Sequence, residues 1–316
     1  MDRKPVTAKS YANIAIIKYW GKDDAKKMVP STSSISLTLE NMYTETSLSP
    51  LPADATAHEF YIDGEFQHLA EQAKIGAVID DLKPADEGGF VRVDTTNNMP
   101  TAAGLSSSSS GLSALVKACN RYYDLGLSQE ELAQKAKFAS GSSSRSFFGP
   151  LAAWDKESGD IYKVQTDLKL AMIMLVLNDK QKPVSSREGM KRCMETSTNF
   201  KEWVEDSQQD YKNMLAYLAA NDFEQIGQLT ERNALAMHAT TRTATPAFSY
   251  LTEESYKAMD FVRELRAVGH ACYFTMDAGP NVKVLCLEED LDQLVPLFDA
   301  RYRTIVSKTK DPQDEE

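Results

Sequence analysis

The sequence contains few cysteines. Of its 316 residues only Cys119, Cys193, Cys272 and Cys286 are cysteine, and no two of them form a CxxC pair. Each lies in a segment with the apolar pattern of a buried element, so we expect buried free thiols rather than disulfides or zinc ligands. Free thiols are typical of a reducing compartment, and we therefore expect a cytoplasmic protein.

Long hydrophobic runs are also missing. The longest apolar run, from Leu170 to Leu177, has the length of a strand and is too short to cross a bilayer. Near the N-terminus, Pro5, Lys9 and Lys18 interrupt the apolar core that a signal peptide requires. The sequence thus predicts neither a membrane span nor a secretory leader.

Positive charge is scarce, with 35 Lys and Arg against 46 Asp and Glu and a formal net charge of −11. This balance argues against a broad surface for nucleic acid or anionic membrane, so an anionic ligand needs a local cluster of cations. The sequence also lacks the Gly-Lys-Ser/Thr end of a Walker P-loop and the GxGxxG dinucleotide fingerprint.

The most distinctive stretch present is the glycine- and serine-rich run PTAAGLSSSSSG at residues 100–111. A strand pattern at 90–94 precedes it, Asn97 and Asn98 break that strand, and an apolar face from Leu112 to Tyr123 predicts a helix after it. A helix N-terminus offers unpaired N–H groups and a favourable potential to a phosphate. Composition alone favours a solvated linker, whereas the position at a helix start favours a phosphate site.

Three further segments carry candidate anion ligands. Strand-like residues 14–18 lead into KYWGK at 18–22, which can hold a phosphate or can be an exposed cation pair beside a core Trp. Residues 140–146, SGSSSRS, add Arg145 to a small-residue loop, for which a flexible surface loop is the alternative. Ser185, Ser186 and Arg187 precede a predicted helix, where capping explains the serines equally well.

Asp277 follows a predicted strand and begins the turn DAGPN at 277–281. Asp is an ordinary turn starter, and taken alone that explanation is the stronger one. The whole set of motifs changes the balance, because it supplies donors for a triphosphate, cations for an acceptor and a base for an alcohol proton. These are the parts of a phosphoryl transfer from a nucleotide to a hydroxyl.

The coarse pattern predicts a mixed α+β protein with no internal repeat. We expect strands at 35–40, 44–49, 60–62, 171–177, 271–276 and 282–287, and a hairpin at 149–165. We expect helices at 69–82, after a Ser128/Glu131 capping box, and at 186–196, 200–220, 222–238, 253–268 and 289–301, followed by a frayed tail from 308. Residues 1–167 and 168–316 form the expected domains, with a boundary somewhere in 165–185.

The motifs resemble those of the GHMP kinases, which are named for galactokinase, homoserine kinase, mevalonate kinase and phosphomevalonate kinase. Within that superfamily, ANIAIIKYWGK at 12–22, NNMPTAAGL at 97–105, SGSxxRS at 140–146 and FTMDAGPN at 274–281 are similar to the mevalonate diphosphate decarboxylases in order and spacing. The resemblance covers essentially the whole chain. It implies a homodimer of two-lobed chains, with an N-terminal ribosomal-protein-S5-domain-2-like lobe and a C-terminal ferredoxin-like, helix-rich lobe.

The resemblance also implies a reaction. (R)-mevalonate 5-diphosphate would be decarboxylated to isopentenyl diphosphate with ATP and Mg²⁺ as cofactors, in the mevalonate pathway of isoprenoid biosynthesis. The 3-hydroxyl would first be phosphorylated, and phosphate and CO₂ would then leave. Asp277 would accept or orient the hydroxyl proton, Lys18 would keep that Asp ionised and neutralise phosphoryl charge, and Arg145 would pair with the substrate carboxylate.

The same resemblance assigns binding residues. The acceptor would be bound by Tyr19, Trp20, Gly21, Lys22, Lys74, Ser140, Gly141, Ser142, Ser143, Ser144, Arg145, Ser186 and Arg187. The nucleotide would be bound by Asn97, Asn98, Pro100, Gly104, Leu105, Ser106, Ser107, Ser108 and Ser109, with Ser108 as the Mg²⁺ contact.

Two other functions fit parts of the pattern. A kinase of the same superfamily, acting on mevalonate or its phosphate, would make ADP and keep the carboxyl carbon, but residues 18–22 and 140–145 favour the decarboxylase. A catalytically silent sensor would bind ATP or a diphosphate without turnover. The presence of Asp277, Lys18 and Arg145 speaks against a sensor.

Overall fold

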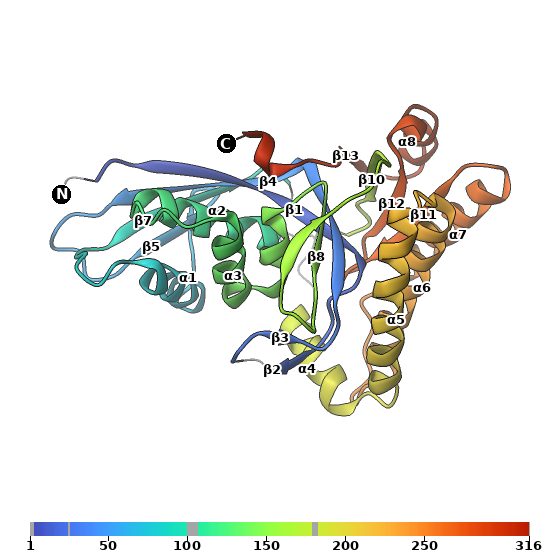
Figure 1. The fold of residues 1–316 in the computed structure, drawn as a ribbon, viewed down its shortest axis with the longest axis horizontal. Helices are drawn as coiled ribbons and strands as arrows, with labels where there is room; N and C mark the ends of the chain where they lie inside the picture. Colours follow the sequence, from blue (N-terminus) through green and yellow to red (C-terminus); the bar gives the residue numbers. More distant parts are fainter. Residues whose placement is uncertain (1–2, 25, 100–106, 179–182, 316) are drawn as a thin grey trace.

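The computed structural model describes residues 3–24, 26–99, 107–178 and 183–315. The chain forms two lobes, each built on its own sheet, and this confirms the predicted two-lobed α+β architecture (Figure 1). Helices α1, α2 and α3 lie at the end of the molecule that carries the N-terminus, and α5, α6 and α7 lie at the opposite end (Figure 1).

The first lobe contains a seven-stranded sheet in the order β6-β5-β7-β4-β8-β9, with β1 also paired to β4. Its strands are β1 Val6–Ile17, β4 Ser34–Pro50, β5 Glu59–Ile62, β6 Glu65–Phe66, β7 Val91–Asn97, β8 Leu151–Trp154 and β9 Ile161–Val164. The hairpin predicted at 149–165 is confirmed by the pairing of β8 with β9. A small separate hairpin, β2 Lys22–Asp24 with β3 Val29–Pro30, was not expected from the sequence.

Strand β4 corrects one prediction. The two strands expected at 35–40 and 44–49 are a single strand of 17 residues. The polar residues Glu40 and Asn41 suggested a break, but they are exposed on a strand that β1 pairs on both sides of them, with a register shift between Tyr11 and Asn13. This bulge lets β1 continue to the centre of the molecule.

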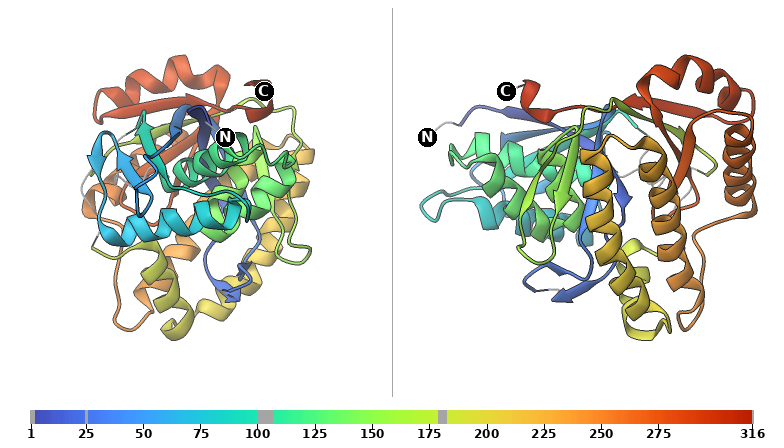
Figure 2. Two further views of the ribbon diagram at one scale, coloured as in Figure 1. Left: turned by 90° about the vertical axis from the view of Figure 1, so that its left-hand side faces the viewer. Right: turned by 45° about the vertical axis from the view of Figure 1, so that its right-hand side comes forward.

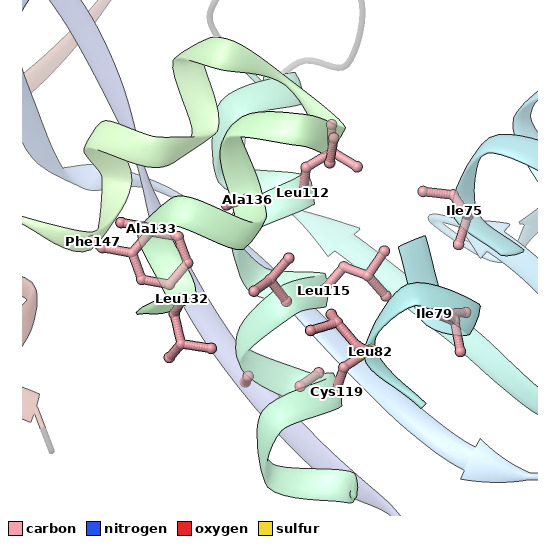
Figure 3. Close-up of a cluster of buried hydrophobic side chains, with 14 of the residues drawn as sticks. Ile75, Ile79, Leu82, Leu112, Leu115, Cys119, Leu132, Ala133, Ala136 and Phe147 are labelled. Atoms are coloured by element: carbon pink, nitrogen blue, oxygen red, sulfur yellow. The ribbon is translucent and has the colours of Figure 1, made fainter. Parts of the chain in front are cut away.

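Helices α1 Leu69–Leu82, α2 Ser107–Tyr122 and α3 Gln129–Ala139 enclose the core of the first lobe. Figure 3 shows Ile75 and Ile79 of α1, Leu112 and Leu115 of α2, and Leu132 of α3 in one buried cluster. The predicted capping box starts α3, because the Glu131 amide donates to Ser128 Oγ at 3.2 Å and the Ser128 amide donates to Glu131 Oε2 at 2.8 Å.

The second lobe contains a four-stranded antiparallel sheet in the order β11-β12-β10-β13. Its strands are β10 Leu170–Leu175, β11 Cys272–Met276, β12 Val282–Leu287 and β13 Thr304–Lys308, and its helices are α4 Ser186–Thr196, α5 Phe200–Ala219, α6 Phe223–Arg242, α7 Glu253–Ala267 and α8 Leu291–Asp299. With helices between β10 and β11 and between β12 and β13, the succession is the βαββαβ of a ferredoxin-like lobe. Figure 2 shows α5 and α6 running side by side.

The C-terminal tail corrects a second prediction. Residues 304–308 form β13 on β10, the Lys310 amide donates to the Thr38 carbonyl at 2.9 Å, and Pro312 is buried. The charged composition suggested fraying, but these contacts are made with segments far away in the sequence. All four cysteines are buried free thiols, as predicted.

The two sheets meet across an apolar layer. Alternation along β10 and β12 places Met172, Met174 and Leu285 on the face that packs against Ile16 and Leu37 of the first lobe. The end of β1 therefore lies between the lobes. Among the residues described, no helix combines the length and the apolar character that a membrane span needs.

Candidate active site

Asp277 lies at the end of β11, where its carboxylate contacts two buried lysines. Lys18 Nζ, at the end of β1, is 2.8 Å from Asp277 Oδ1. Lys283 Nζ, on β12, is 3.0 Å from Asp277 Oδ2. The two lysine side chains are 2% and 0% exposed, whereas that of Asp277 is 23% exposed. One ammonium therefore faces each carboxylate oxygen, and the carboxylate retains access to a ligand.

The pKa values of Asp277 and Lys18 differ from those of the free side chains. Burial opposes ionisation of Asp277, but the charges of Lys18 and Lys283 outweigh it and hold the pKa of Asp277 below its ordinary value. Burial lowers the pKa of Lys18 to about 8, with repulsion from Lys283 and Arg145 added and attraction by Asp277 opposing. The group carries net positive charge at neutral pH, as an anionic phosphoryl group requires.

Lys18 is held in place by groups from both lobes. Its Nζ also donates to the Ala15 carbonyl at 2.7 Å, and its backbone amide donates to Asn233 Oδ1 at 2.8 Å. Asn233 Nδ2 in turn donates to Asp210 Oδ2 at 2.9 Å. Asn233 lies on α6 and Asp210 on α5, in helices without a distinctive motif, so the sequence did not single them out.

His238 of α6 completes the surroundings of this group. Its ring is buried, and neither ring nitrogen has a hydrogen-bond partner in the part of the chain that the structure describes. Burial and the nearby charge of Lys18 lower the pKa of His238 to about 3. The imidazole is therefore neutral at physiological pH and adds no charge to the site.

Arg145 lies in a buried 3₁₀ helix, η1 Gly141–Phe147, so the alternative of a flexible surface loop is wrong. Its Nε donates to Ser36 Oγ at 3.0 Å and its NH1 donates to Ser34 Oγ at 2.7 Å. Burial lowers the pKa of Arg145 to about 10, and no carboxylate of the described residues lies within 4.0 Å of the guanidinium. A buried guanidinium with neutral partners is suited to bind an incoming carboxylate.

Asn13 connects η1 to the sheet. Its Nδ2 donates to the Ser142 carbonyl and to Ser146 Oγ, both at 2.8 Å, and its Oδ1 lies 3.4 Å from Arg145 NH2. Its backbone nitrogen lies 3.5 Å from Ser109 Oγ at the start of α2. Asn13 was not among the candidates, although it belongs to the segment at 12–22 that carries the resemblance.

Tyr19 packs its ring against Trp154, with ring centroids 5.3 Å apart. Its hydroxyl is buried without a hydrogen-bond partner among the described residues, and burial raises its pKa. Gly141 makes room for this ring, because a Cβ at Gly141 would lie 2.7 Å from Tyr19 Cζ. A buried hydroxyl without a partner is suited to donate to a ligand.

Trp20 and Gly21 are packed against other parts of the chain and support the neighbouring site residues. The Trp20 ring is buried in an apolar cluster, and its Nε1 donates to Thr240 Oγ1 at 3.1 Å. Gly21 has φ +111° and lies so close to Ser31 and Phe200 that a Cβ would approach both within 2.6 Å. The alternative that Trp20 is a core residue is therefore correct, whereas Lys22 is half-buried rather than exposed.

Lys22 and Arg187 form a second cationic group beside Tyr19. Burial and the charge of Arg187 lower the pKa of Lys22, and the charge of Arg187 also acts on Tyr19. Within the described ranges, neither cation has a carboxylate partner within 4.0 Å. Ser185 caps α4 by accepting from the Glu188 amide at 3.1 Å, so Ser186 is the first helical residue.

The serines at 140–144, in η1 and directly before it, divide into two kinds. Ser140 and Ser142 are half-buried, and their hydroxyls lie 3.2 Å apart. Ser143 and Ser144 are buried, and Ser144 Oγ donates to the Gly141 carbonyl at 2.8 Å. Ser140 and Ser142 are therefore the members with access to a ligand.

The nucleotide candidates are only partly described. Pro100, Gly104, Leu105 and Ser106 lie outside the described residues, and for Ser107 and Ser108 the structure gives the helical backbone without the side chains. Ser109 is buried at the start of α2.

The side chains of Asn97 and Asn98 have different surroundings. The Asn98 side chain accepts from the Tyr43 amide at 2.7 Å and donates to the Asn41 carbonyl at 2.8 Å, which fixes the turn after β7. Asn97 instead lines a cavity of about 170 Å³ with Lys74, Gly111 and apolar residues of α1 and α2.

Lys74 is the acceptor candidate that the structure separates from the rest. The only acceptor candidate among the residues lining the cavity of about 170 Å³ is Lys74. Its Nζ lies 4.0 Å from Glu71 Oε2 and is partly exposed. Lys74 therefore shares its surroundings with the nucleotide candidate Asn97.

Two family models match the chain. Residues 10–165 match a model described as diphosphomevalonate decarboxylase-like N-terminal domain. Residues 172–315 match a model described as mevalonate 5-diphosphate decarboxylase C-terminal domain.

Individual proteins are similar over nearly the whole chain. Diphosphomevalonate decarboxylase mvd1 of Aspergillus fumigatus is 32% identical over 311 residues, which is 90% of this chain and 77% of the relative. The structure of mevalonate pyrophosphate decarboxylase from Streptococcus pyogenes is 68% identical and covers 98% of both chains with a TM-score of 0.94. The structure of MDDEF in complex with MVAPP, AMPPCP and magnesium is 38% identical and covers 97% of both chains with a TM-score of 0.91.

Proposed function

The chain belongs to the diphosphomevalonate decarboxylase family, and we propose that its site converts mevalonate 5-diphosphate and ATP to isopentenyl diphosphate, ADP, phosphate and CO₂. The observation that best supports this proposal is that an ionised carboxylate and a buried guanidinium lie close to each other between the lobes. Asp277 is held ionised by Lys18 and Lys283, and the buried Arg145 lies near it with neutral partners.

Asp277 is suited to orient the 3-hydroxyl of the substrate and to receive its proton. Its carboxylate is ionised at every physiological pH and is partly accessible, as a group that meets an alcohol must be. Lys18 would neutralise charge on the phosphoryl group as it arrives. Both residues would act before any carbon is lost.

Arg145 is suited to hold the carboxylate that leaves as CO₂. Ser34 and Ser36 fix its guanidinium, so little side-chain entropy remains to be lost when the carboxylate binds. After phosphorylation, departure of the 3-phosphate leaves an electron-poor tertiary carbon. The electrons of the bond to the carboxylate fill that site, so no organic electron acceptor is needed.

The cationic group of Lys22 and Arg187, with Tyr19, Ser140 and Ser142, would bind the diphosphate end of the substrate. The described residues provide no carboxylate partner for these two cations and no hydrogen-bond partner for the buried Tyr19 hydroxyl, and both facts support this assignment. Trp20, Gly21, Gly141, Ser143, Ser144 and Ser186 would shape these positions rather than provide the main contacts.

ATP would lie along the start of α2. The helix N-terminus at Ser107, the run 100–109 and the adjoining cavity with Asn97 and apolar side chains suit a triphosphate and a base. We place Lys74 on this nucleotide side, because it lines that cavity. Asn98 would maintain the turn that precedes the run.

Mg²⁺ fits this site as an ion carried by phosphates. No group of three acidic, histidine or cysteine side chains able to hold a metal occurs in the described part of the chain, and Mg²⁺ commonly binds through substrate phosphates. Ser108, at the helix start, remains the proposed protein contact. When bound, Mg²⁺ would supply positive charge that neutralises the phosphates of ATP.

The decisive experiment incubates the purified protein with ATP, Mg²⁺ and mevalonate 5-diphosphate labelled with ¹⁴C in the carboxyl group. A decarboxylase releases ¹⁴CO₂ and ADP in equal amounts. ADP without ¹⁴CO₂ would identify a kinase, and saturable binding of ATP without either product would identify a sensor.

We also propose three properties of the whole protein, namely its domain bounds, its oligomeric state and its location. Residues 1–167 and 168–316 would be the two domains, supported by the change of sheet between Val164 and Leu170. A homodimer is supported by the family resemblance, and light scattering coupled to size-exclusion chromatography would test it. A cytoplasmic location is supported by four free thiols and would be tested by fractionation.

A further inference from the structure

Asp277 has two buried counter-ions where one would neutralise it. Burying an ammonium costs several kcal/mol unless another charge compensates it, so a second lysine is not expected for stability alone. Lys18 and Lys283 lie within 3.0 Å of opposite oxygens of the same carboxylate. The second lysine therefore needs an explanation in the chemistry of the site.

Lys283 is fixed in a sheet. It lies on β12, between β11 and β10, where its register partners are Thr275 on one side and Met174 on the other. Its side chain is 0% exposed and lies on the same face of the sheet as Met174 and Leu285, the face that meets the first lobe. Strand pairing on both sides prevents its backbone from moving relative to β11, which carries Asp277.

Lys18 is placed differently. It follows the last residue of β1, in the other lobe, and Arg145 lies close enough for the two charges to repel each other. Lys18 is therefore on the side of the group where the substrate carboxylate would bind, and Lys283 is on the side of the sheet.

We infer that Lys283 is a positioning residue that serves as the permanent counter-ion of Asp277 and thereby allows Lys18 to interact with the phosphoryl group during transfer. The inference rests on the proposed function. If Lys18 were the sole partner, each move toward the phosphoryl group would leave a buried carboxylate unpaired. With Lys283 present, Asp277 keeps a counter-ion while the Lys18 ammonium moves toward the negative charge of the phosphoryl group.

The test removes the charge of Lys283 and measures turnover against pH. The charged groups around Asp277 are Lys18, Lys283 and Arg145, and His238 is neutral. Lys283→Met should fold, because Lys18 still pairs with Asp277. We expect kcat to fall about tenfold, less than the ~10²–10³ of a group in direct contact with the developing charge, with KM for both substrates nearly unchanged.

The pH profile separates positioning from a structural role. Wild-type turnover should fall as Lys18 loses its proton near pH 8. Without the repulsion from Lys283, the pKa of Lys18 rises, so the alkaline limb of Lys283→Met should move to higher pH. Thr275→Val, which changes the neighbouring side chain on the same face without changing charge, should leave this limb in place.

Lys283→Gln provides a second variant that keeps an N–H donor without the charge, and it should show the same upward shift. A variant that folds and keeps both the wild-type kcat and the wild-type alkaline limb would overturn the inference. ¹⁵N NMR of the Lys18 ammonium measures its titration in the free protein. Failure of the wild type to release CO₂ would count against the proposed function, whereas an unchanged Lys18 titration in Lys283→Met would count against the inference.

Discussion

At the scale of single residues, the proposed reaction depends most directly on the negative charge of Asp277. Asp277→Asn keeps the shape of the side chain but removes its charge, so the group can neither accept the hydroxyl proton nor balance Lys18 and Lys283. We expect turnover to fall by ~10³ or more. ATP should bind nearly as before, because the nucleotide site lies along α2.

Release of ¹⁴CO₂ and equilibrium binding of ATP measure these two effects separately. The exposed Asp206→Asn, on α5, is the matched control and should retain wild-type turnover. Asp277→Asn should also be less stable, by about 3–5 kcal/mol, because two buried ammonium groups lose their counter-charge. An Asn variant with near-normal CO₂ release would contradict the role given to Asp277.

His238 provides a prediction about stability against pH. Its pKa is about 3 in the folded protein and about 6.5 in the unfolded chain, so the unfolded chain binds more protons between these values. Stability therefore rises with pH across this window and is lost as the pH falls. From pH 7 to pH 5 we expect His238 alone to remove about 2 kcal/mol of the free energy of unfolding.

Urea unfolding at pH 7 and pH 5 measures this contribution. His238→Phe removes the titrating group and keeps an aromatic ring, so its stability should fall less between the two pH values than that of the wild type. His270→Phe, in the partly exposed connection between α7 and β11, is the matched control. Equal losses for the wild type and His238→Phe would show that His238 is not buried as a neutral ring.

At the scale of elements, η1 and the strand end that carries Tyr19 fit together through Gly141. Gly141→Ala would place a Cβ 2.7 Å from the Tyr19 ring, and both the ring and η1 are packed on their other sides. Overpacking of this kind costs about 1–3 kcal/mol. We expect KM for mevalonate 5-diphosphate to rise about tenfold, since Tyr19 must move, and each tenfold is about 1.4 kcal/mol.

Steady-state kinetics with ATP held saturating measures this change. Gly88→Ala is the control, because it lies in an exposed loop with nothing within 4 Å of its added Cβ. An unchanged KM in Gly141→Ala would mean that the position of Tyr19 does not matter for substrate binding.

The elements also show which parts of the fold the sequence could predict. Helices α1 and α4 begin and end at the predicted residues, because apolar periodicity and caps are local signals. Strand β13 was missed, since it exists only through pairing with β10 more than 100 residues earlier. The buried η1 was expected to be a loop because its burial depends on Ser34 and Ser36 of β4.

The same distinction applies to the site. Lys18, Arg145 and Asp277 could be predicted because they belong to motifs with recognisable spacing. Lys283 could not, because it belongs to none of these motifs. The available signal was Leu285, which lies two residues after Lys283 and therefore on the same face of the strand. An apolar residue there, with Val282 and Val284 on the other face, indicates a strand buried on both faces and hence a buried lysine.

At the scale of the whole molecule, the site exists only while the lobes are docked. Lys18 and Arg145 come from the first lobe, and Asp277, Lys283 and Asn233 come from the second. Any contact that holds the lobes together therefore supports catalysis, even when it lies far from the substrate.

The C-terminal tail is such a contact. The Lys310 amide donates to Thr38, Asp311 pairs with Lys163, and Pro312 packs against Gly149, where a Cβ would lie 2.8 Å from the Pro312 ring. Deleting residues 310–316 removes a backbone hydrogen bond, an ion pair and an apolar contact, which together contribute about 3 kcal/mol. We expect Tm to fall by several degrees, because β13 then keeps its hydrogen bonds to Asn41 and the apolar layer but loses the contacts of the tail with the first sheet.

Turnover should fall at temperatures below the global transition, since the lobes separate before either unfolds. A shorter deletion of residues 314–316 keeps Pro312 in place and serves as the control. Comparing the temperature of activity loss with that of unfolding by circular dichroism distinguishes separation from unfolding. If the longer deletion loses activity only as the whole protein unfolds, the two lobes form one cooperative unit, and the tail stabilises the fold without controlling how Lys18 meets Asp277.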